Sequence, residues 1–137
     1  MPYEYFEHEA DVGIMGTGKS LEEAFEEGAK AMFNVMVDID KIEPKEIVRI
    51  ECKAANNEEL FVEWLNKLLA EAGMNNMVFS KFKIESIKND KLTGYAIGEA
   101  LDQEKHNIKT EVKAATYSQL SIKKENDNYI VKCIVDV

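Results

Sequence analysis

The sequence predicts an α+β fold, with an antiparallel β-sheet and two α-helices packed on one face of it. Two segments, 20–37 and 57–73, place apolar residues at the spacing of one helical face. From residue 78 onward, apolar and polar residues alternate instead, as they do in half-buried strands. The 137 residues, 45% of them hydrophobic, are enough for one well-filled core. We therefore expect a single domain that spans residues 1–137.

The N-terminal part of the chain predicts two short strands and then the first helix. The strands are expected at 3–7 and 12–17, with a charged loop between them. The helix follows at 20–37, where Ser20 is placed as the N-cap and Glu23 completes a capping box.

The remaining elements follow from a change in the period of the apolar residues. After Pro44, residues 48–54 alternate as a half-buried strand. Asn57 is expected to cap the second helix, which ends at Gly73. Four long strands are then expected at 78–88, 91–101, 110–123 and 129–137, with turns at Asn89-Asp90 and 125–128.

Residues 13–20, GIMGTGKS, match the phosphate-binding pattern G-x-x-x-x-G-K-[ST] at every fixed position. That pattern requires a buried parallel strand before the loop, but the preceding FEHEADV contains four ionisable residues. The hydroxyl of Ser20 is needed as the helix cap, and the glutamates of the first helical turns repel phosphate. We therefore interpret Gly13–Ser20 as a glycine-rich turn from a strand into a capped helix, with an accidental motif match and no nucleotide site.

The acidic composition restricts the class of partner. The net charge of −9 at pH 7 argues against direct, nonspecific binding of nucleic acid, and it favours hard cations or a basic protein partner. Cys52 and Cys133 stand far apart in apolar, strand-like runs, which is typical of buried, reduced thiols. Neither an export signal nor a membrane-spanning segment is visible, so we expect a cytoplasmic protein without membrane contact.

Polar residues able to act together gather first near the two ends of the chain. His8 and Asp11 lie in the loop between the short strands, and Asp136 precedes the final residue, Val137, with its carboxylate. The first and last strands of an antiparallel sheet are often neighbours, which would bring Asp11 to the C-terminus. Carboxylate oxygens suit calcium, magnesium or manganese better than zinc. Surface aspartates that simply face water are the alternative interpretation.

A further polar group lies at the end of a predicted strand. The segment Gly98–His106 contains Glu99, Asp102 and His106, and such a histidine is more often a hydrogen-bonded structural group than a ligand or base. Lys113 alternates with apolar neighbours and should point away from the core. It is then either solvated or in contact with an anionic group of a partner.

Taken together, these segments resemble the archease family nearly from end to end. The motifs that carry the resemblance are H-x-x-D (His8 and Asp11), S-L-E-E-A-F at the start of the first helix, F-x-x-W-L-N-x-L-L (Phe61–Leu69), G-E-x-L-D-x-x-x-H (Gly98–His106), E-V-K-A-A-T-Y (Glu111–Tyr117) and a terminal Asp-Val. The combination of the G-E-x-L-D and E-V-K-A-A-T-Y segments is distinctive. The family often has glycines before its first helix, which is consistent with an accidental match in GIMGTGKS.

The resemblance implies an accessory protein and not an enzyme. Archeases assist the RtcB-type tRNA-splicing ligase, whose reaction depends on GTP and manganese, by promoting its guanylylation and multiple turnover. The resemblance also implies that tRNA is contacted only indirectly, through the ligase. The alternative function is a small metal-dependent phosphohydrolase or nucleotide-binding protein that uses Asp11 and Asp136.

The resemblance further implies which residues act. A divalent metal, calcium in the first place with magnesium or manganese as alternatives, would be held by Asp11, Asp136 and Val137. Lys113 would take part in activating the ligase. The remaining residues expected on the shared polar surface that activates the partner are His8, Glu99, Asp102 and His106.

Overall fold

The computed structural model describes residues 2–8 and 11–137, and for Glu7 and His8 it describes the backbone alone. In chain order, the elements are β1 (Tyr3–His8), β2 (Asp11–Gly18), α1 (Leu21–Met36), the 3-10 helix η1 (Ile39–Lys41), β3 (Glu46–Lys53), α2 (Asn57–Asn75), β4 (Met77–Lys88), β5 (Lys91–Ala100), α3 (Gln103–His106), β6 (Ala114–Ala115), β7 (Ser121–Glu125) and β8 (Asn128–Asp136). No helix in this described part of the chain has both the length and the apolar composition that crossing a membrane requires.

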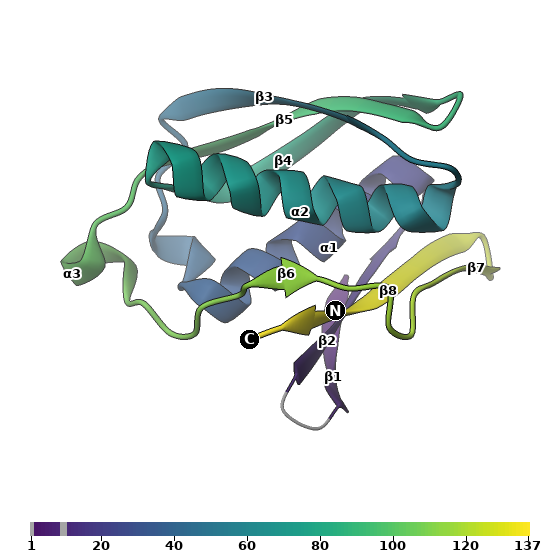
Figure 1. Ribbon diagram of the computed structural model, residues 1–137, viewed down its shortest axis with the longest axis horizontal. Helices are drawn as coiled ribbons and strands as arrows, with labels where there is room; N and C mark the ends of the chain where they lie inside the picture. Colours follow the sequence, from purple (N-terminus) through teal and green to yellow (C-terminus); the bar gives the residue numbers. More distant parts are fainter. Residues whose placement is uncertain (1, 9–10) are drawn as a thin grey trace.

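The two long helices lie between two antiparallel sheets (Figure 1). One sheet has the strand order β1-β2-β8-β6, with β7 also paired to β8, and the other has the order β3-β5-β4. Helix α1 packs against β2 in the first sheet and β4 in the second, and α2 packs against β3 and β6. The predicted α+β class is confirmed, and the two helices cover one face of each of two sheets.

The layer between the sheets is the hydrophobic core. Trp64 of α2 is fully buried, and its Nε1 donates a hydrogen bond to the backbone carbonyl of Phe25 in α1 at 3.0 Å. The rings of Phe25 and Phe61 lie 5.0 Å apart between the two helices, and Phe33 of α1 contacts Phe79 of β4 with a ring separation of 5.5 Å. These aromatic contacts fix the helices against each other and against the β3-β5-β4 sheet.

The glycine-rich segment belongs to a strand and not to a loop. Residues Gly13 to Gly18 pair with β8 throughout, so the turn into α1 is confined to the residues that follow. Ser20 caps α1 as predicted, because its side-chain oxygen accepts the backbone N–H of Glu23 at 3.0 Å. A Cβ on Gly16 would overlap backbone atoms of α1, so this glycine allows the strand and the helix to touch.

Left-handed backbone conformations fall on residues other than glycine. In the described part of the chain no glycine has a positive φ, whereas seven other residues do: Asn76, Asn89, Asp90, Asn107, Gln119, Asn126 and Asp127. Asn and Asp tolerate this conformation because their short polar side chains bond locally. The predicted tight turns at 89–90 and 125–128 are confirmed as the hairpins β4–β5 and β7–β8.

The predicted ends of the second helix differ from the observed ones. Asn56, whose side chain accepts the backbone N–H of Glu59, is the N-cap, and Asn57 is already helical. The helix also continues past Gly73, because the residue that terminates it is the left-handed Asn76.

The prediction of a continuous strand at 110–123 is wrong. Only β6 and β7 in this region are strands. The backbone N–H groups of Lys113 and Thr116 donate to carbonyls of β8, but Gln119 has a φ of 51° and breaks the extended path. The alternation of apolar residues was present, whereas the regular backbone pairing was not.

Candidate functional site

Two strand ends bring together the aspartates that the sequence analysis proposed as metal ligands. Strand β2 begins at Asp11, β8 ends at Asp136, and Val12 is paired with Val135. The next residues along these antiparallel strands are Asp11 and Asp136, which therefore lie at the same end of neighbouring strands, near the C-terminus (Figure 1). Opposite residues of an antiparallel pair project on one face of the sheet, so the two carboxylates share a face.

The histidine of the same motif is only partly described. The backbone of His8 pairs with Asp11 in the β1–β2 register, which places His8 at this edge of the sheet. Its side chain lies outside the described residues, and so do residues 9 and 10 of the loop. The predicted role of His8 stays a prediction.

Lys113 reaches the same edge from the other side of β8. Its backbone N–H donates to the carbonyl of Asp136 at 2.8 Å, and the next residue, Ala114, is paired with Asp136. Lys113 and Asp136 are both exposed, as the alternation around Lys113 predicted. Three segments of the sequence therefore bring the backbones of Asp11, Asp136 and Lys113 together at one end of the sheet.

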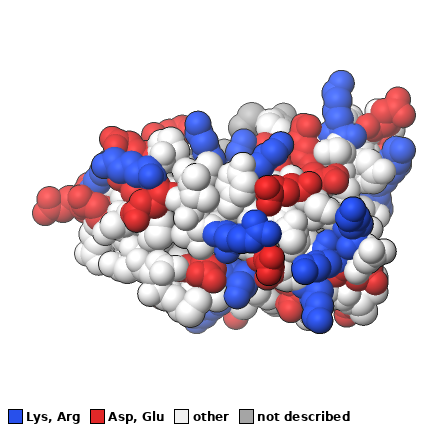
Figure 2. Space-filling view, turned by 90° about the horizontal axis from the view of Figure 1, so that it is seen from above, with Lys and Arg blue, Asp and Glu red and all other residues white. Residues whose placement is uncertain are grey.

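A groove with a volume of 710 Å³ adjoins Lys113. Its walls are the C-terminal half of α2, the end of α1 and the connection between α3 and β6, and its charged lining residues are Glu111 and Lys113. On another side of the molecule, the outward face of β3-β5-β4 carries interspersed acidic and basic side chains (Figure 2), so the charges there largely offset one another. The groove is thus a mainly apolar surface beside the lysine.

Glu99 and His106 form a buried pair. His106 is fully buried, and Glu99 is 6% exposed. The Nδ1 of His106 accepts the backbone N–H of Asp102 at 3.0 Å, so the ring proton is on Nε2, which donates to Glu99 at 2.8 Å. Glu99 also accepts the backbone N–H of Glu43 at 2.8 Å. These hydrogen bonds lower the pKa of Glu99 from 4.5 to about 2, and the bond from His106 has the largest effect.

The neighbouring residues complete a hydrogen-bond network between the end of β5 and α3. Asp102 caps α3, a short helix that the sequence analysis did not predict, and its Oδ1 accepts the backbone N–H of Glu104 at 3.1 Å. The ammonium of Lys105 donates to Glu99 at 2.9 Å. The expectation of a polar surface is corrected here, because Glu99 and His106 face inward. Their predicted role in activating a partner stays a prediction.

Comparison with known proteins identifies the family. The sequence model of the Archease protein family (MTH1598/TM1083) matches residues 3–137. The chain belongs to the archease family. The protein archease of Sulfolobus acidocaldarius is 42% identical and that of Pyrococcus abyssi is 40% identical, and each alignment covers 98% of both chains.

Solved archease-like structures have the same fold. Protein 1598 from Methanobacterium thermoautotrophicum is 37% identical in sequence to this chain, and its solution structure has a TM-score of 0.86 over 99% of both chains. The crystal structure of an archease from Thermotoga maritima, described as a possible chaperone, has a TM-score of 0.63 over 96% of this chain and 94% of that one. At 20% identity, this second likeness supports the fold alone. Archease membership supports an accessory role for this chain and not a catalytic one.

The donor set of this archease is compatible with a hard divalent cation. Asp11 and Asp136 offer carboxylate oxygens at one sheet edge, and Val137 follows directly. Such oxygens suit calcium, magnesium or manganese. Among the residues that the structure describes, no three His, Cys, Asp or Glu side chains gather as a metal cluster. A cation at this edge would therefore take ligands in addition to the two aspartates.

The sequence analysis missed Asn66, a residue of α2 that shapes this edge of the archease fold. Its side chain makes two hydrogen bonds to the backbone of Ala115 in β6, next to the Lys113 segment. A weak signal was present, because Asn66 is an amide at the border of the apolar stripe, directly after Leu65. Buried amides need partners, so an amide in such a position indicates a specific hydrogen bond.

Proposed function

We propose that this protein is an accessory factor that activates an RtcB-type tRNA-splicing ligase in the cytoplasm by promoting guanylylation and multiple turnover of the ligase. The observation that supports this most directly is the convergence of Asp11, Asp136 and Lys113 on one sheet edge. The family match supports the same function, since the residues that meet here come from the archease motifs.

The chemistry of this edge is suited to a phosphate-handling partner. Asp11, Asp136 and Val137 would hold a divalent cation, calcium first with magnesium or manganese as alternatives. When bound, such a cation supplies positive charge that can offset the charge of a nucleoside triphosphate. Lys113 is exposed and its backbone is bonded to Asp136, and a lysine ammonium is a mobile point charge that can contact a phosphate or a carboxylate of the partner. In this mechanism tRNA is contacted only by the ligase.

The proposal is tested by ligase turnover at limiting ligase, with and without this protein. The wild-type protein should raise both guanylylation and the number of ligation cycles. Asp11→Ala, Asp136→Ala and Lys113→Ala should each abolish the stimulation without unfolding the protein, because all three side chains lie at the molecular surface or its margin.

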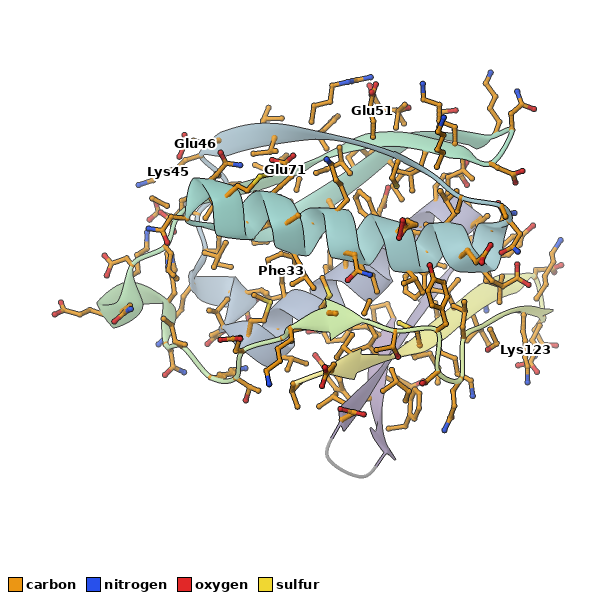
Figure 3. All side chains as sticks on the ribbon, in the orientation of Figure 1. Phe33, Lys45, Glu46, Glu51, Glu71 and Lys123 are labelled. Atoms are coloured by element: carbon orange, nitrogen blue, oxygen red, sulfur yellow. The ribbon has the colours of Figure 1, made fainter. Side chains whose placement is uncertain are left out.

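The matched control for the lysine variant is Lys123→Ala. Lys123 is exposed on β7 in the same sheet, and it pairs with Ile130, six residues from Asp136 along β8 or about 20 Å. Figure 3 shows it at the end of the molecule away from the C-terminus of the chain. This control should stimulate the ligase as the wild type does. Wild-type stimulation by all three site variants would refute the proposed function.

A second assay separates the alternative enzyme class. The purified protein is incubated with GTP and a divalent cation, without ligase. Release of phosphate that requires Asp11 and Asp136 would favour a metal-dependent phosphohydrolase, whereas an accessory factor releases none.

A further inference from the structure

One side chain of α2 acts as the backbone partner of β6. Asn66 Oδ1 accepts the N–H of Ala115 at 2.8 Å, and Asn66 Nδ2 donates to the carbonyl of the same residue at 3.1 Å. A primary amide carries one acceptor and two donors, so a single Asn can satisfy both backbone groups of one residue. A neighbouring strand makes the same pair of bonds in a regular antiparallel sheet.

The two hydrogen bonds are made to a very short strand. Strand β6 has two residues, and the backbone N–H groups of Lys113 and Thr116, on either side of it, donate to carbonyls of β8 at 2.8 and 2.9 Å. The N–H and C=O of Ala115 are bonded to Asn66 instead. Ala115 is 5% exposed, so water does not readily replace that partner.

The position of Asn66 in the helix argues that these bonds are required. The side chain is half-buried at the border of the apolar stripe of α2, directly after the fully buried Leu65. Leucine would favour the helix more than asparagine does. An amide that replaces a leucine here is compensated only if it is hydrogen-bonded.

We infer that Asn66 is a positioning residue, which holds β6 against β8 and thereby fixes Lys113 beside Asp136. We call the two hydrogen bonds between Asn66 and Ala115 the clamp. The effect of the clamp on ligase stimulation rests on the proposed function, whereas the clamp itself can be measured in the isolated protein. Asn66 and Lys113 both line the 710 Å³ groove, so the clamp also fixes one wall of that groove. Asn66 acts through the β6 segment and touches the partner in no step of this scheme.

The test compares Asn66→Ala with Asn75→Ala, a matched control on the same helix. The Asn75 side chain is exposed and bonds only within α2, to the carbonyl and carboxylate of Glu71. Two measurements are made on each variant: the hydrogen exchange rate of the Ala115 and Lys113 amides without ligase, and ligase stimulation titrated to saturation. A third variant, Asn66→Asp, keeps the acceptor for the Ala115 N–H and loses only the donor to its carbonyl.

In Asn66→Ala we expect exchange of the Ala115 and Lys113 amides to accelerate by about tenfold or more, because the two clamp bonds are gone. Maximal ligase stimulation should fall by about tenfold, since Lys113 is no longer held in place. Asn66→Asp should lie between Asn66→Ala and the wild type in both measurements. If Asn66→Ala does not fold, the comparison of Asn66→Asp with the wild type tests the clamp in its place. Asn75→Ala should match the wild type.

Unchanged amide exchange in Asn66→Ala and Asn66→Asp would overturn the clamp. Wild-type maximal stimulation by a variant with accelerated exchange would overturn its link to Lys113. If the wild-type protein itself fails to stimulate the ligase, the proposed function fails, and the exchange comparison alone then decides whether Asn66 holds β6.

Discussion

Gly16→Ala should destabilise the protein because Gly16 lies where β2 touches α1. An alanine Cβ at this position would overlap the backbone oxygen of Ala24 and the backbone nitrogen of Gly28, and would lie 2.9 Å from the Cα of Gly28. These are backbone atoms of a helix held between two sheets, so they cannot rotate away. Overpacking costs about 1–3 kcal/mol, and a rigid neighbour places this site at about 3 kcal/mol. Replacing a strand glycine by alanine recovers about 0.5–1 kcal/mol, which leaves a net loss of about 2 kcal/mol.

Thermal and urea unfolding followed by circular dichroism measure this loss. For a chain of this size, about 2 kcal/mol corresponds to a fall in Tm of about 8 °C. The control is Gly73→Ala in α2, where a Cβ would meet no atom within 4 Å, and the higher helix propensity of alanine should raise stability by up to about 1 kcal/mol. A Gly16→Ala variant as stable as the wild type would show that Gly16 is not needed for close packing of the strand on the helix.

Three further predictions follow from buried groups. The pKa of Glu99 is lowered to about 2, so the ionised carboxylate stabilises the protein fully above pH 4.5, and this stabilisation is lost as the pH falls toward 2. In urea unfolding, Glu99→Gln should therefore lose less stability over this pH range than the wild type does. An equal loss in both proteins would contradict the pair with His106. Burial raises the pKa of the Cys133 thiol to about 12 and that of the Cys52 thiol to about 11. Both thiols should therefore react with iodoacetamide at pH 8 at least about tenfold more slowly than free cysteine. Unfolding the protein in urea should remove this difference. Trp64→Phe removes a buried hydrogen bond and part of the core volume, and should lower the free energy of unfolding by about 1–3 kcal/mol. Urea unfolding followed by circular dichroism measures this change. An unchanged free energy of unfolding would show that the bond is dispensable.

Local chemistry made several parts of this fold predictable from the sequence. Ser20 marked the start of α1 and the Asn89-Asp90 pair marked a hairpin turn, because each signal acts over a few residues. The alternation of apolar and polar residues predicted the ends of β4, β5 and β8 to within two residues. The meeting of Asp11 and Asp136 was anticipated, but not for the expected reason, because the neighbour of the last strand is β2 and not the first strand β1. The register of β2 and β8 brings the two aspartates to one edge.

Other features depend on distant partners and were therefore not predictable from local patterns. Alternation shows which side of a strand faces the core, but not which strands pair, so the division into two sheets was not visible. The burial of Glu99 is compensated by His106, Lys105 and the backbone N–H of Glu43, which all bond to its carboxylate. The 110–123 segment has strand-like alternation, but Asn66 of α2 replaces a strand as the partner of Ala115.

The roles of glycine and asparagine in this chain reverse a common shorthand of sequence interpretation. Left-handed bends are made by asparagine, aspartate and Gln119, whereas glycines such as Gly16 mark places where two backbones meet without side chains between them. Searches that equate glycine-rich runs with anion-cradling loops will match such crossings wherever a strand lies directly on a helix. For protein engineering, the left-handed asparagines are the positions open to glycine, and glycines at backbone crossings such as Gly16 should be left unchanged.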